Sequence, residues 1–212
     1  RGTGQRQIVT GEPVSEPQIQ IKELCLRRFV DADASYLFSL DNDPEVMRYI
    51  NGGAPTPYAV IETEILPSFL AVDKGGPLFG FWAVVVNGGF CGWVSLRHLE
   101  ADAQTASLGY RFCRAVWGRG YATEAARAII ARAFDGLGLM RVVATTYEKN
   151  RASRQVMEKL GMRLVRRFRI SAADLEISDT YYASGAEVWD GDDVEYAVDR
   201  DQWRRIFTTS VP

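Results

Sequence analysis

Two apolar runs on either side of a short polar turn constrain the fold of this chain more than any other feature. The runs cover residues 78–86 and 90–96, and Asn87-Gly88-Gly89 separates them. Asparagine and glycine tolerate the positive φ angles of the tight turns that join adjacent strands. The pattern therefore predicts a β-hairpin near the middle of the chain.

Helical and extended patterns alternate on both sides of this hairpin. Helices are predicted over residues 31–40, 43–50, 58–72, 122–134 and 150–160. Further strands are predicted over residues 19–29, 106–116, 141–146, 165–168 and 194–198. Asp31 is the expected N-cap of the first helix, and Asp43-Pro44 begins the second. Because helices and hairpins are mixed, we expect an α+β fold with a mixed, twisted sheet of about seven strands flanked by about four helices.

Length and composition bound the number of domains. A chain of 212 residues, of which 47% are hydrophobic, is long enough for a sizeable core and too apolar to be disordered. We expect one domain over residues 19–207, between a flexible leader over 1–18 and a short tail over 208–212. No apolar run approaches the roughly 20 residues of a membrane span, and the leader lacks the apolar stretch of a signal peptide. No membrane association is therefore expected.

The cysteine and histidine content argues against a metal centre. Cys25, Cys91 and Cys113 are widely spaced, and His98 is the single histidine. These residues supply neither a Cys/His zinc cluster nor a disulfide framework, so we expect no metal and a reducing, cytoplasmic compartment. We interpret His98, at the end of a predicted strand, as a surface or hydrogen-bonded residue rather than a base.

Charge is distributed unevenly, although the formal net charge is only −2. Residues 97–169 contain 15 basic and 6 acidic side chains, whereas residues 170–212 contain 3 basic and 10 acidic ones. A basic centre within an acidic protein favours a bound anion there, although solvated helix faces would give the same counts. Nucleic acid is not expected as a partner, because the chain as a whole is not basic.

One segment, residues 117–124, combines the features of a phosphate-binding site. It reads Trp-Gly-Arg-Gly-Tyr-Ala-Thr-Glu and joins a predicted strand to an amphipathic helix. Gly118 and Gly120 allow a tight turn and a close approach of the backbone to a ligand. The start of the helix offers unpaired N–H groups and a positive dipole end, to which Arg114 and Arg119 add charge-assisted contacts. The segment is neither a Walker A loop nor a GxGxxG dinucleotide motif.

This segment and several others resemble the GNAT superfamily of acetyl-CoA-dependent N-acetyltransferases, and in particular its RimJ/RimL-like branch. The cofactor loop of the superfamily, Q/R-x-x-G-x-G/A, is matched by residues 117–122, with tryptophan in the first place as is common in that branch. The other matches are Asp43-Pro44-Glu45-Val46, Arg48-Tyr49, Gly109-Tyr110, Asn150-Arg151-Ala152-Ser153, Lys159-Leu160-Gly161-Met162, Asp193, Tyr196 and Trp203. The resemblance covers residues 21–203 and implies a single domain with the GNAT fold.

The resemblance implies a site for acetyl-CoA between two strands that separate near Arg114 and Thr145. The strand that ends at residues 112–114 would pair with the pantetheine arm, and the loop after it would hold the pyrophosphate through backbone N–H groups. Asn150 would hydrogen-bond the pantetheine or its neighbouring backbone, and would also cap its own helix. The implied cofactor-binding residues are Phe112, Cys113, Arg114, Gly118, Arg119, Gly120, Tyr121, Ala122, Thr123, Asn150 and Ser153.

The catalytic residues that the resemblance implies are Ser153 and Asn150. Ser153 is the candidate to protonate the leaving thiolate, because the tyrosine that many relatives carry four residues later is Met157 here. The attacking amine must also lose a proton, and the glutamate that many relatives place before the Gly-Tyr pair is Ser107 here. The alternatives for this base are a chain of water molecules, Glu176 and Glu187.

The implied activity is direct transfer of an acetyl group from acetyl-CoA to a primary amine, without a metal. The acceptor is a protein N-terminus or a small amine, and the acidic run at residues 190–193 is either a solvated turn or a feature that attracts such a cation. Two rivals stay open: a non-catalytic acyl-CoA-binding module, and a transferase for another acyl-CoA, for which Arg111 and Arg114 would supply cations. Acetyl-CoA and the acceptor are the expected partners, and a homodimer is left open.

Overall fold

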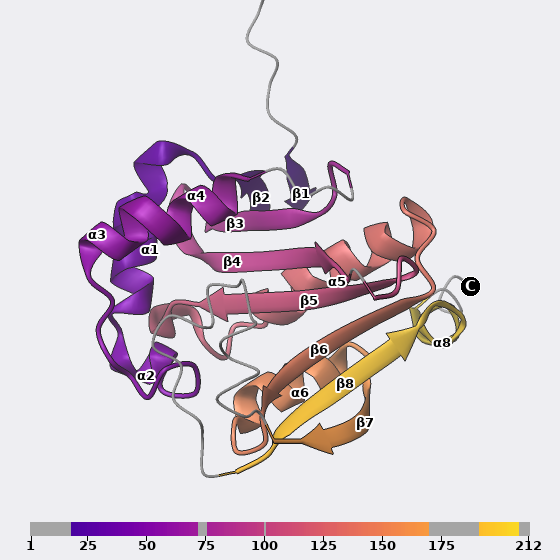
Figure 1. Ribbon diagram of the computed structural model, residues 1–212. Helices are drawn as coiled ribbons and strands as arrows, with labels where there is room; N and C mark the ends of the chain where they lie inside the picture. Colours follow the sequence, from indigo (N-terminus) through magenta and orange to yellow (C-terminus); the bar gives the residue numbers. More distant parts are fainter. Residues whose placement is uncertain (1–17, 72–75, 100, 170–190, 208–212) are drawn as a thin grey trace, which may run out of the picture.

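The computed structural model describes residues 18–71, 76–99, 101–169 and 191–207, which form an α+β fold around one mixed sheet (Figure 1). Eight strands lie in these residues in the order β1-β2-β3-β4-β5-β6-β8-β7, so β1 and β7 are the edges. Their bounds are β1 Ile19–Ile21, β2 Leu24–Arg28, β3 Gly80–Val86, β4 Gly89–His98, β5 Thr105–Phe112, β6 Arg141–Tyr147, β7 Arg163–Phe168 and β8 Asp193–Asp199. Neighbouring strands are antiparallel except β5 and β6, which run parallel. The predicted fold class is confirmed, with one strand more than expected.

The additional strand comes from a turn inside the segment predicted as a single first strand. Lys22 has a φ of 49°, in the left-handed region, and the chain reverses there between β1 and β2. The hairpin predicted around Asn87-Gly88-Gly89 is confirmed as β3 and β4, with Asn87 at a φ of 49° and Gly88 at 79°. Both turns need positive φ angles, but only the second is made of residues that favour them.

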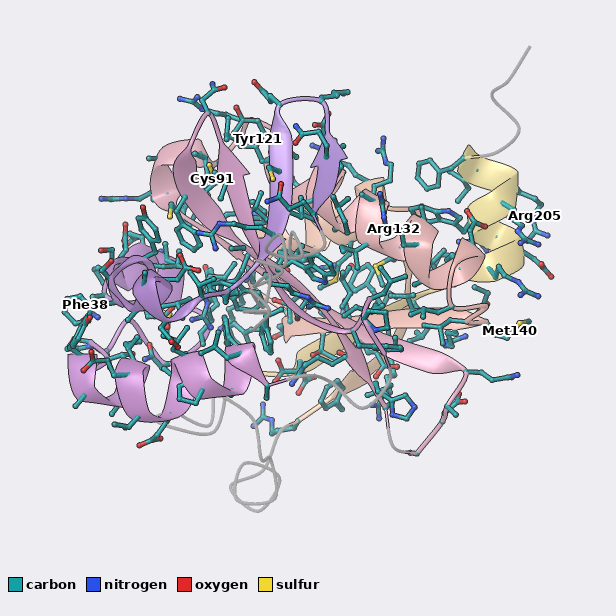
Figure 2. All side chains as sticks on the ribbon, turned by 90° about the horizontal axis from the view of Figure 1, so that it is seen from above. Phe38, Cys91, Tyr121, Arg132, Met140 and Arg205 are labelled. Atoms are coloured by element: carbon teal, nitrogen blue, oxygen red, sulfur yellow. The ribbon has the colours of Figure 1, made fainter. Side chains whose placement is uncertain are left out.

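Helices cover both faces of the sheet, and the sheet separates the core into two clusters (Figure 2). Successive residues of β3 alternate between them, because Phe81 belongs to the cluster under α1 and Trp82 to the cluster under α5. In Figure 2, Phe38 marks the first helical layer and Arg132 the second. The helices are α1 Ala34–Asp41, α2 Pro44–Met47, α3 Tyr58–Val60, α4 Leu66–Leu70, α5 Tyr121–Asp135, α6 Arg151–Lys159 and α8 Arg200–Phe207. No helix within the described ranges has both the length and the apolarity to cross a bilayer.

The amphipathic helix predicted over 122–134 is confirmed as α5, and it packs at the centre of the larger cluster. Its buried apolar residues recur with the spacing of one helix face. They are Tyr121, Ala125, Ala126, Ile129, Ile130, Ala133 and Phe134. The alanines let the helix approach the sheet closely, and each buried isoleucine stabilises this packing by about 1.5–3 kcal/mol.

The start of α1 differs from the prediction. Asp33, not Asp31, is the N-cap residue of α1. Its carboxylate is 2% exposed and accepts hydrogen bonds from the guanidinium of Arg27 and from the backbone N–H of Val30. Two other helical segments also differ from the prediction: α2 ends at Met47, and a π-helical turn spans Ile61–Ile65. A 3-10 turn over Arg114–Val116 stands where a strand is predicted. Helix α8 is not predicted from the sequence.

The parallel pair at the centre of the sheet is short. It has three register pairs, Thr105 with Arg141, Ala106 with Val142 and Ser107 with Val143. Beyond Ser107, β5 continues to Phe112 along β4, whereas β6 continues to Tyr147 along β8. The two strands therefore diverge, as their ribbons in Figure 1 show, and the separation begins after Ser107 and Val143, earlier along the strands than the predicted position near Arg114 and Thr145.

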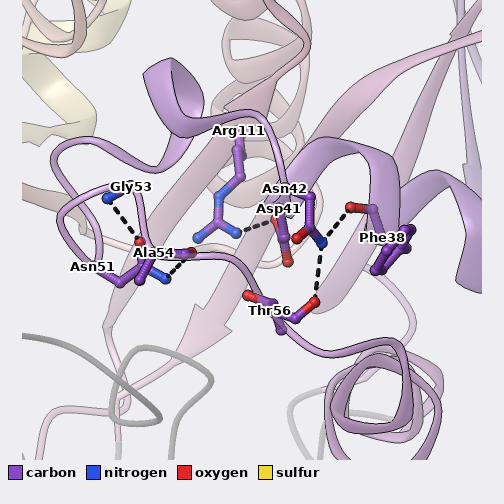
Figure 3. A network of polar contacts seen from close by, with 8 residues as sticks. All are labelled: Phe38, Asp41, Asn42, Asn51, Gly53, Ala54, Thr56 and Arg111. Atoms are coloured by element: carbon purple, nitrogen blue, oxygen red, sulfur yellow. Dashed lines mark hydrogen bonds and ion pairs between the residues drawn. The ribbon is translucent and has the colours of Figure 1, made fainter.

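A buried ion pair ties β5 to the helical layer that contains α1 (Figure 3). Nη1 of Arg111 contacts Oδ1 of Asp41, and the two side chains are 3% and 0% exposed. Next to this pair, Nδ2 of Asn42 donates to the carbonyls of Phe38 and Thr56 at 2.9 and 3.0 Å. Because both charges are buried, removal of one partner would leave the other without compensation.

The substitution Asp41→Ala is therefore expected to lower the free energy of unfolding by about 3–5 kcal/mol, the cost of breaking a buried ion pair. Urea unfolding followed by tryptophan fluorescence measures this loss. The matched control is Glu45→Ala, because Glu45 lies 3.8 Å from Arg48 in an exposed pair. That change is expected to cost at most about 1 kcal/mol. Equal losses in the two variants would contradict the importance assigned to the buried pair.

Candidate active site

A cavity of about 910 Å³ opens where β5 and β6 diverge. Its walls come from β5, the start of α5, β6, α6 and the residues that follow α2. Within the described residues, no strand pairs with this edge of β5 beyond Ser107. Backbone N–H and C=O groups that would otherwise join the two strands are therefore available to a ligand in the cavity.

The glycine loop ends at the same opening. Gly118 and Gly120 have φ angles of 77° and 86°, and a Cβ atom added to either would meet nothing within 4 Å. Gly120 is the N-cap residue of α5, so the N–H groups of the first helical turn have no carbonyl acceptor within the helix. Trp117 anchors the loop, since its Nε1 donates to the carbonyl of Phe112 at 2.8 Å. An anion in front of α5 would meet open space, backbone donors and the positive end of the helix dipole.

Eight of the eleven predicted cofactor-binding residues line this cavity. They are Phe112, Gly118, Gly120, Tyr121, Ala122, Thr123, Asn150 and Ser153. Arg119 does not line it, and Cys113 and Arg114 line a second pocket of about 360 Å³ beside α1 and α2. There, Nε of Arg114 lies 3.2 Å from Oδ2 of Asp43. A role for these three residues in cofactor binding stays a prediction.

Two hydroxyl groups meet at the start of α6. Oη of Tyr110 lies 2.9 Å from Oγ of Ser153 and donates to the Ser153 carbonyl at 3.0 Å. Both residues line the cavity, Tyr110 from β5 and Ser153 from the first turn of α6. Asn150 caps α6, because its Oδ1 accepts from the backbone N–H of Ser153 at 3.2 Å, and this predicted cap is confirmed. The cap and the tyrosine fix Ser153 at the cavity wall.

The residues considered for the base lie in different places. Ser107, where many relatives of the resembling family have glutamate, lines the cavity at the point where β5 and β6 separate. Glu176 and Glu187 lie outside the described residues. His98 ends β4 with its ring centre 5.9 Å from that of Phe79, and it is not among the residues that line the cavity.

Asp193 is the single acidic residue among the described residues that line the cavity. It begins β8, in register with Tyr147 of β6 and Phe168 of β7. The residue is 7% exposed, and this burial, helped by the charge of Asp192, raises the pKa of its carboxyl group to about 6. Such a group is mostly ionised at neutral pH and is suited to binding a cation or accepting a proton.

Sequence reasoning did not include Asp193 among the site residues. It placed the acidic run at residues 190–193 in a solvated turn, with attraction of a cation as the alternative. One signal in the sequence could have identified Asp193 as a site residue: it matches the pattern of the resembling family, together with Tyr196 and Trp203. Its burial depends on strand pairing between segments far apart in the sequence, which no local pattern records.

The three cysteines of the chain are free thiols. Burial raises the pKa of the Cys113 thiol to about 11, and the nearby Cys91 contributes in the same direction. A thiol with this pKa is protonated at neutral pH and is a poor nucleophile. In the described part of the chain, no group of three or more His, Cys, Asp or Glu side chains is placed to hold a metal ion.

The cavity thus combines an unpaired strand edge with a helix N-terminus, an arrangement suited to an extended ligand that carries an anionic group. Residues 23–163 match the family model described as an acetyltransferase (GNAT) domain. The chain therefore belongs to the GNAT acetyltransferase family, whose members carry out acetyl-CoA-dependent acetylation. The fold, the family and the class of enzyme expected from the sequence are confirmed.

Named relatives and solved structures agree with this assignment. The FsC-acetyl coenzyme A-N(2)-transacetylase of Aspergillus fumigatus is 29% identical over 200 residues, which cover 91% of this chain and 80% of that protein. The uncharacterized N-acetyltransferase YnaD of Bacillus subtilis is 30% identical over 175 residues, or 81% of this chain and 98% of that protein.

The similar solved structures share the fold at lower sequence identity. A GNAT-family acetyltransferase from Bacillus anthracis has a TM-score of 0.68 at 23% identity, covering 87% of this chain and 99% of that one. The RimL ribosomal L7/L12 alpha-N-protein acetyltransferase in complex with coenzyme A has a TM-score of 0.69 at 17% identity, covering 88% and 99%. The RimL-like character expected from the sequence is thus confirmed at the level of fold.

Iodoacetamide at pH 7.5 is expected to modify Cys113 far more slowly than a free cysteine peptide. With a pKa of about 11, the thiol is ionised roughly 300-fold less at this pH than free cysteine, whose pKa is about 8.5. At pH values below that pKa, the rate is expected to rise about tenfold for each unit by which the pH is raised, because only the thiolate reacts. Peptide mass spectrometry after timed reaction measures both rates. Modification of Cys113 as fast as the peptide would contradict the raised pKa.

Proposed function

We propose that this chain transfers the acetyl group of acetyl-CoA to a primary amine, which is a protein N-terminus or a small amine. The observation that carries the proposal is that the split between β5 and β6 meets the glycine-rich start of α5 in one cavity. The names of two similar proteins, an N(2)-transacetylase and an alpha-N-protein acetyltransferase, describe transfer to nitrogen in those proteins and support an amine acceptor here.

The residues present fit acetyl-CoA as the donor. Gly118 and Gly120 leave open space in which phosphate oxygens can approach the backbone N–H groups at the start of α5. Beyond Ser107, the edge of β5 that faces β6 has no strand partner in the described residues, and it can pair with the amide groups of a pantetheine arm. Acetyl-CoA supplies an activated thioester, and the protein's part is to orient it against the acceptor.

Ser153 is the residue that we assign to protonation of the leaving thiolate. Its Oγ lies 2.9 Å from Oη of Tyr110, so the phenol can pass a proton to Ser153 after the serine protonates the thiolate, and the proton that the attacking amine releases restores the phenol through water. Met157, where many relatives have a tyrosine, also lines the cavity but has no proton to donate. Asn150 supports this role by fixing the backbone of Ser153.

The alternative acyl donor is less favoured by the geometry. A succinyl group would need cations near the acyl end of the donor, and Arg111 and Arg114 were the candidates. Arg111 lines the cavity but is engaged by the buried Asp41, and Arg114 lies beside Asp43 in the second pocket. The other rival, an acyl-CoA-binding module without turnover, would share the cavity but would have no need for the Tyr110 and Ser153 hydroxyl pair.

The proposal also includes the cellular compartment and the partners of the protein. We expect the cytoplasm, because a reducing compartment suits a chain with three free cysteines. Acetyl-CoA and the amine acceptor are the proposed partners. A homodimer stays a prediction.

The substitution Gly120→Glu tests the donor site. The new carboxylate would stand in front of α5 and repel the phosphates, so the Kd for acetyl-CoA is expected to rise at least tenfold, a change of about 1.4 kcal/mol or more. Isothermal titration calorimetry measures it. Gly138→Glu is the matched control, because Gly138 also has a positive φ, 68°, and open space but does not line the cavity. Wild-type protein that fails to bind acetyl-CoA would refute the proposed function.

Ser153→Ala is expected to lower kcat for acetyl transfer by about 100-fold, the contribution of a general acid. The Kd for acetyl-CoA should change less than about threefold, because backbone groups provide most of the proposed donor contacts. Release of the coenzyme A thiol across a panel of primary amines measures kcat, and Ser68→Ala on α4 is the control. An unchanged kcat would remove Ser153 from the mechanism, and no turnover by the wild type would favour the binding module.

A further inference from the structure

The carboxylate of Asp193 has no partner among the residues that the structure describes. The residue is 7% exposed and lines the cavity. Among the described residues, no group donates a hydrogen bond to this carboxylate and no cation forms an ion pair with it. The raised pKa of Asp193 agrees with this, because its causes are burial and the like charge of Asp192, and no hydrogen bond or cation lowers it. A carboxylate with so little exposed surface is poorly hydrated, so a cationic ligand in the cavity would bind it favourably.

Asp193 lies on the face of the sheet that α2 covers. The next residue, Val194, is buried in the cluster that contains α5 and α6. Because side chains alternate along a strand, Asp193 projects to the opposite face, where α2 lies. Tyr49, which follows α2, reaches this face as well, and its ring centre lies 5.9 Å from that of Tyr147. Donor and acceptor groups would thus enter the cavity from opposite faces of the sheet.

The walls next to Asp193 are aromatic. Tyr147 and Phe168 lie beside it in register on the two neighbouring strands, and Tyr49 packs on Tyr147. All four residues line the cavity. An alkyl or arylalkyl chain would pack on these rings while its charged end reaches the carboxylate.

The charged groups on the elements around Asp193 are engaged with one another. The ion pairs are Asp192 with Arg169 at 3.5 Å, Glu148 with Arg167 at 2.9 Å and Glu195 with Arg166 at 2.8 Å. Two further cations lie over rings, Lys149 at 5.7 Å from the centre of Tyr147 and Arg48 at 5.3 Å from the centre of Tyr49. None of these described neighbours is in ion-pair contact with Asp193, so its charge is left for the ligand.

We propose that Asp193 binds the ammonium group of the acceptor, so that the enzyme selects cationic alkyl amines over neutral nucleophiles of the same shape. The inference rests on the proposed function, since it names the substrate class of the same site. It also separates two tasks on the cavity wall: Ser153 serves the leaving group of the donor, and Asp193 serves the incoming acceptor.

The test compares two small probes of equal shape, 2-phenylethylamine, which is cationic at pH 7.5, and the neutral 2-phenylethanol. Each is titrated by calorimetry into the complex of the protein with coenzyme A. The wild type is expected to bind the amine at least tenfold more tightly than the alcohol. Asp193→Asn is expected to abolish this preference. The affinities of this variant for the alcohol and for coenzyme A should stay within about twofold of the wild-type values, and such unchanged binding would exclude misfolding.

Asp192→Asn is the matched control, because Asp192 is the adjacent carboxylate and does not itself line the cavity, whereas its partner Arg169 does. This variant is expected to keep the preference for the amine. In the wild type, the preference should fade as the pH falls through about 6, since protonation removes the charge of Asp193. Asp192→Asn should move that midpoint to lower pH, because it removes the like charge that raises the pKa.

Three results would overturn the inference: equal affinity of the wild type for the two probes, an unchanged amine preference in Asp193→Asn, or the same loss in Asp192→Asn as in Asp193→Asn. If coenzyme A itself did not bind the wild type, the proposed function would fail together with the inference. Binding of coenzyme A without a preference for the amine would instead refute the inference alone.

Discussion

The parallel pairing of β5 with β6 is the constraint on which the rest of the structure depends. Parallel neighbours need a crossover connection, and α5 provides it. The crossover starts where β5 ends, so the first turn of α5 lies at the end of the sheet where the two strands have already separated after Ser107. The gap between two strands and the helix N-terminus at its open end thus follow from one topological feature.

The structural features that the sequence predicts depend on a few neighbouring residues. Most of those that it does not predict depend on the pairing of strands that lie far apart in the chain. The Asn87-Gly88-Gly89 turn, the Asn150 cap and the glycine loop each depend on a few consecutive residues, and each lies where expected. Lys22 adopts the same left-handed conformation as Asn87, but lysine carries no preference for it, so the turn between β1 and β2 was missed. The burial of Asp193 arises only when β8 pairs with β6 and β7.

Two buried carboxylates show how the same residue type takes different roles. Asp41 is completely buried and is compensated by Arg111, so this pair joins the helical layer to the sheet. Asp193 is almost as buried, but its oxygens open onto the cavity and no described cation pairs with it. The first acid is satisfied by folding itself. Under our proposal, the second is compensated by the charge that a ligand brings, which would distinguish a structural from a functional acid.

The two edges of the sheet, as the described strands form it, differ in how they resist pairing with another chain. β1 offers only three residues, too few to support a stable new strand. β7 is longer, and its Leu164 and Val165 are 42% and 46% exposed, an apolar pair that would favour growth of the sheet onto another chain. Three of its six residues are arginines, however, so two copies that met edge to edge would bring guanidinium groups together and desolvate them. The arginine-rich strand that lines the cavity with Arg166 and Phe168 therefore disfavours pairing of two copies at this edge.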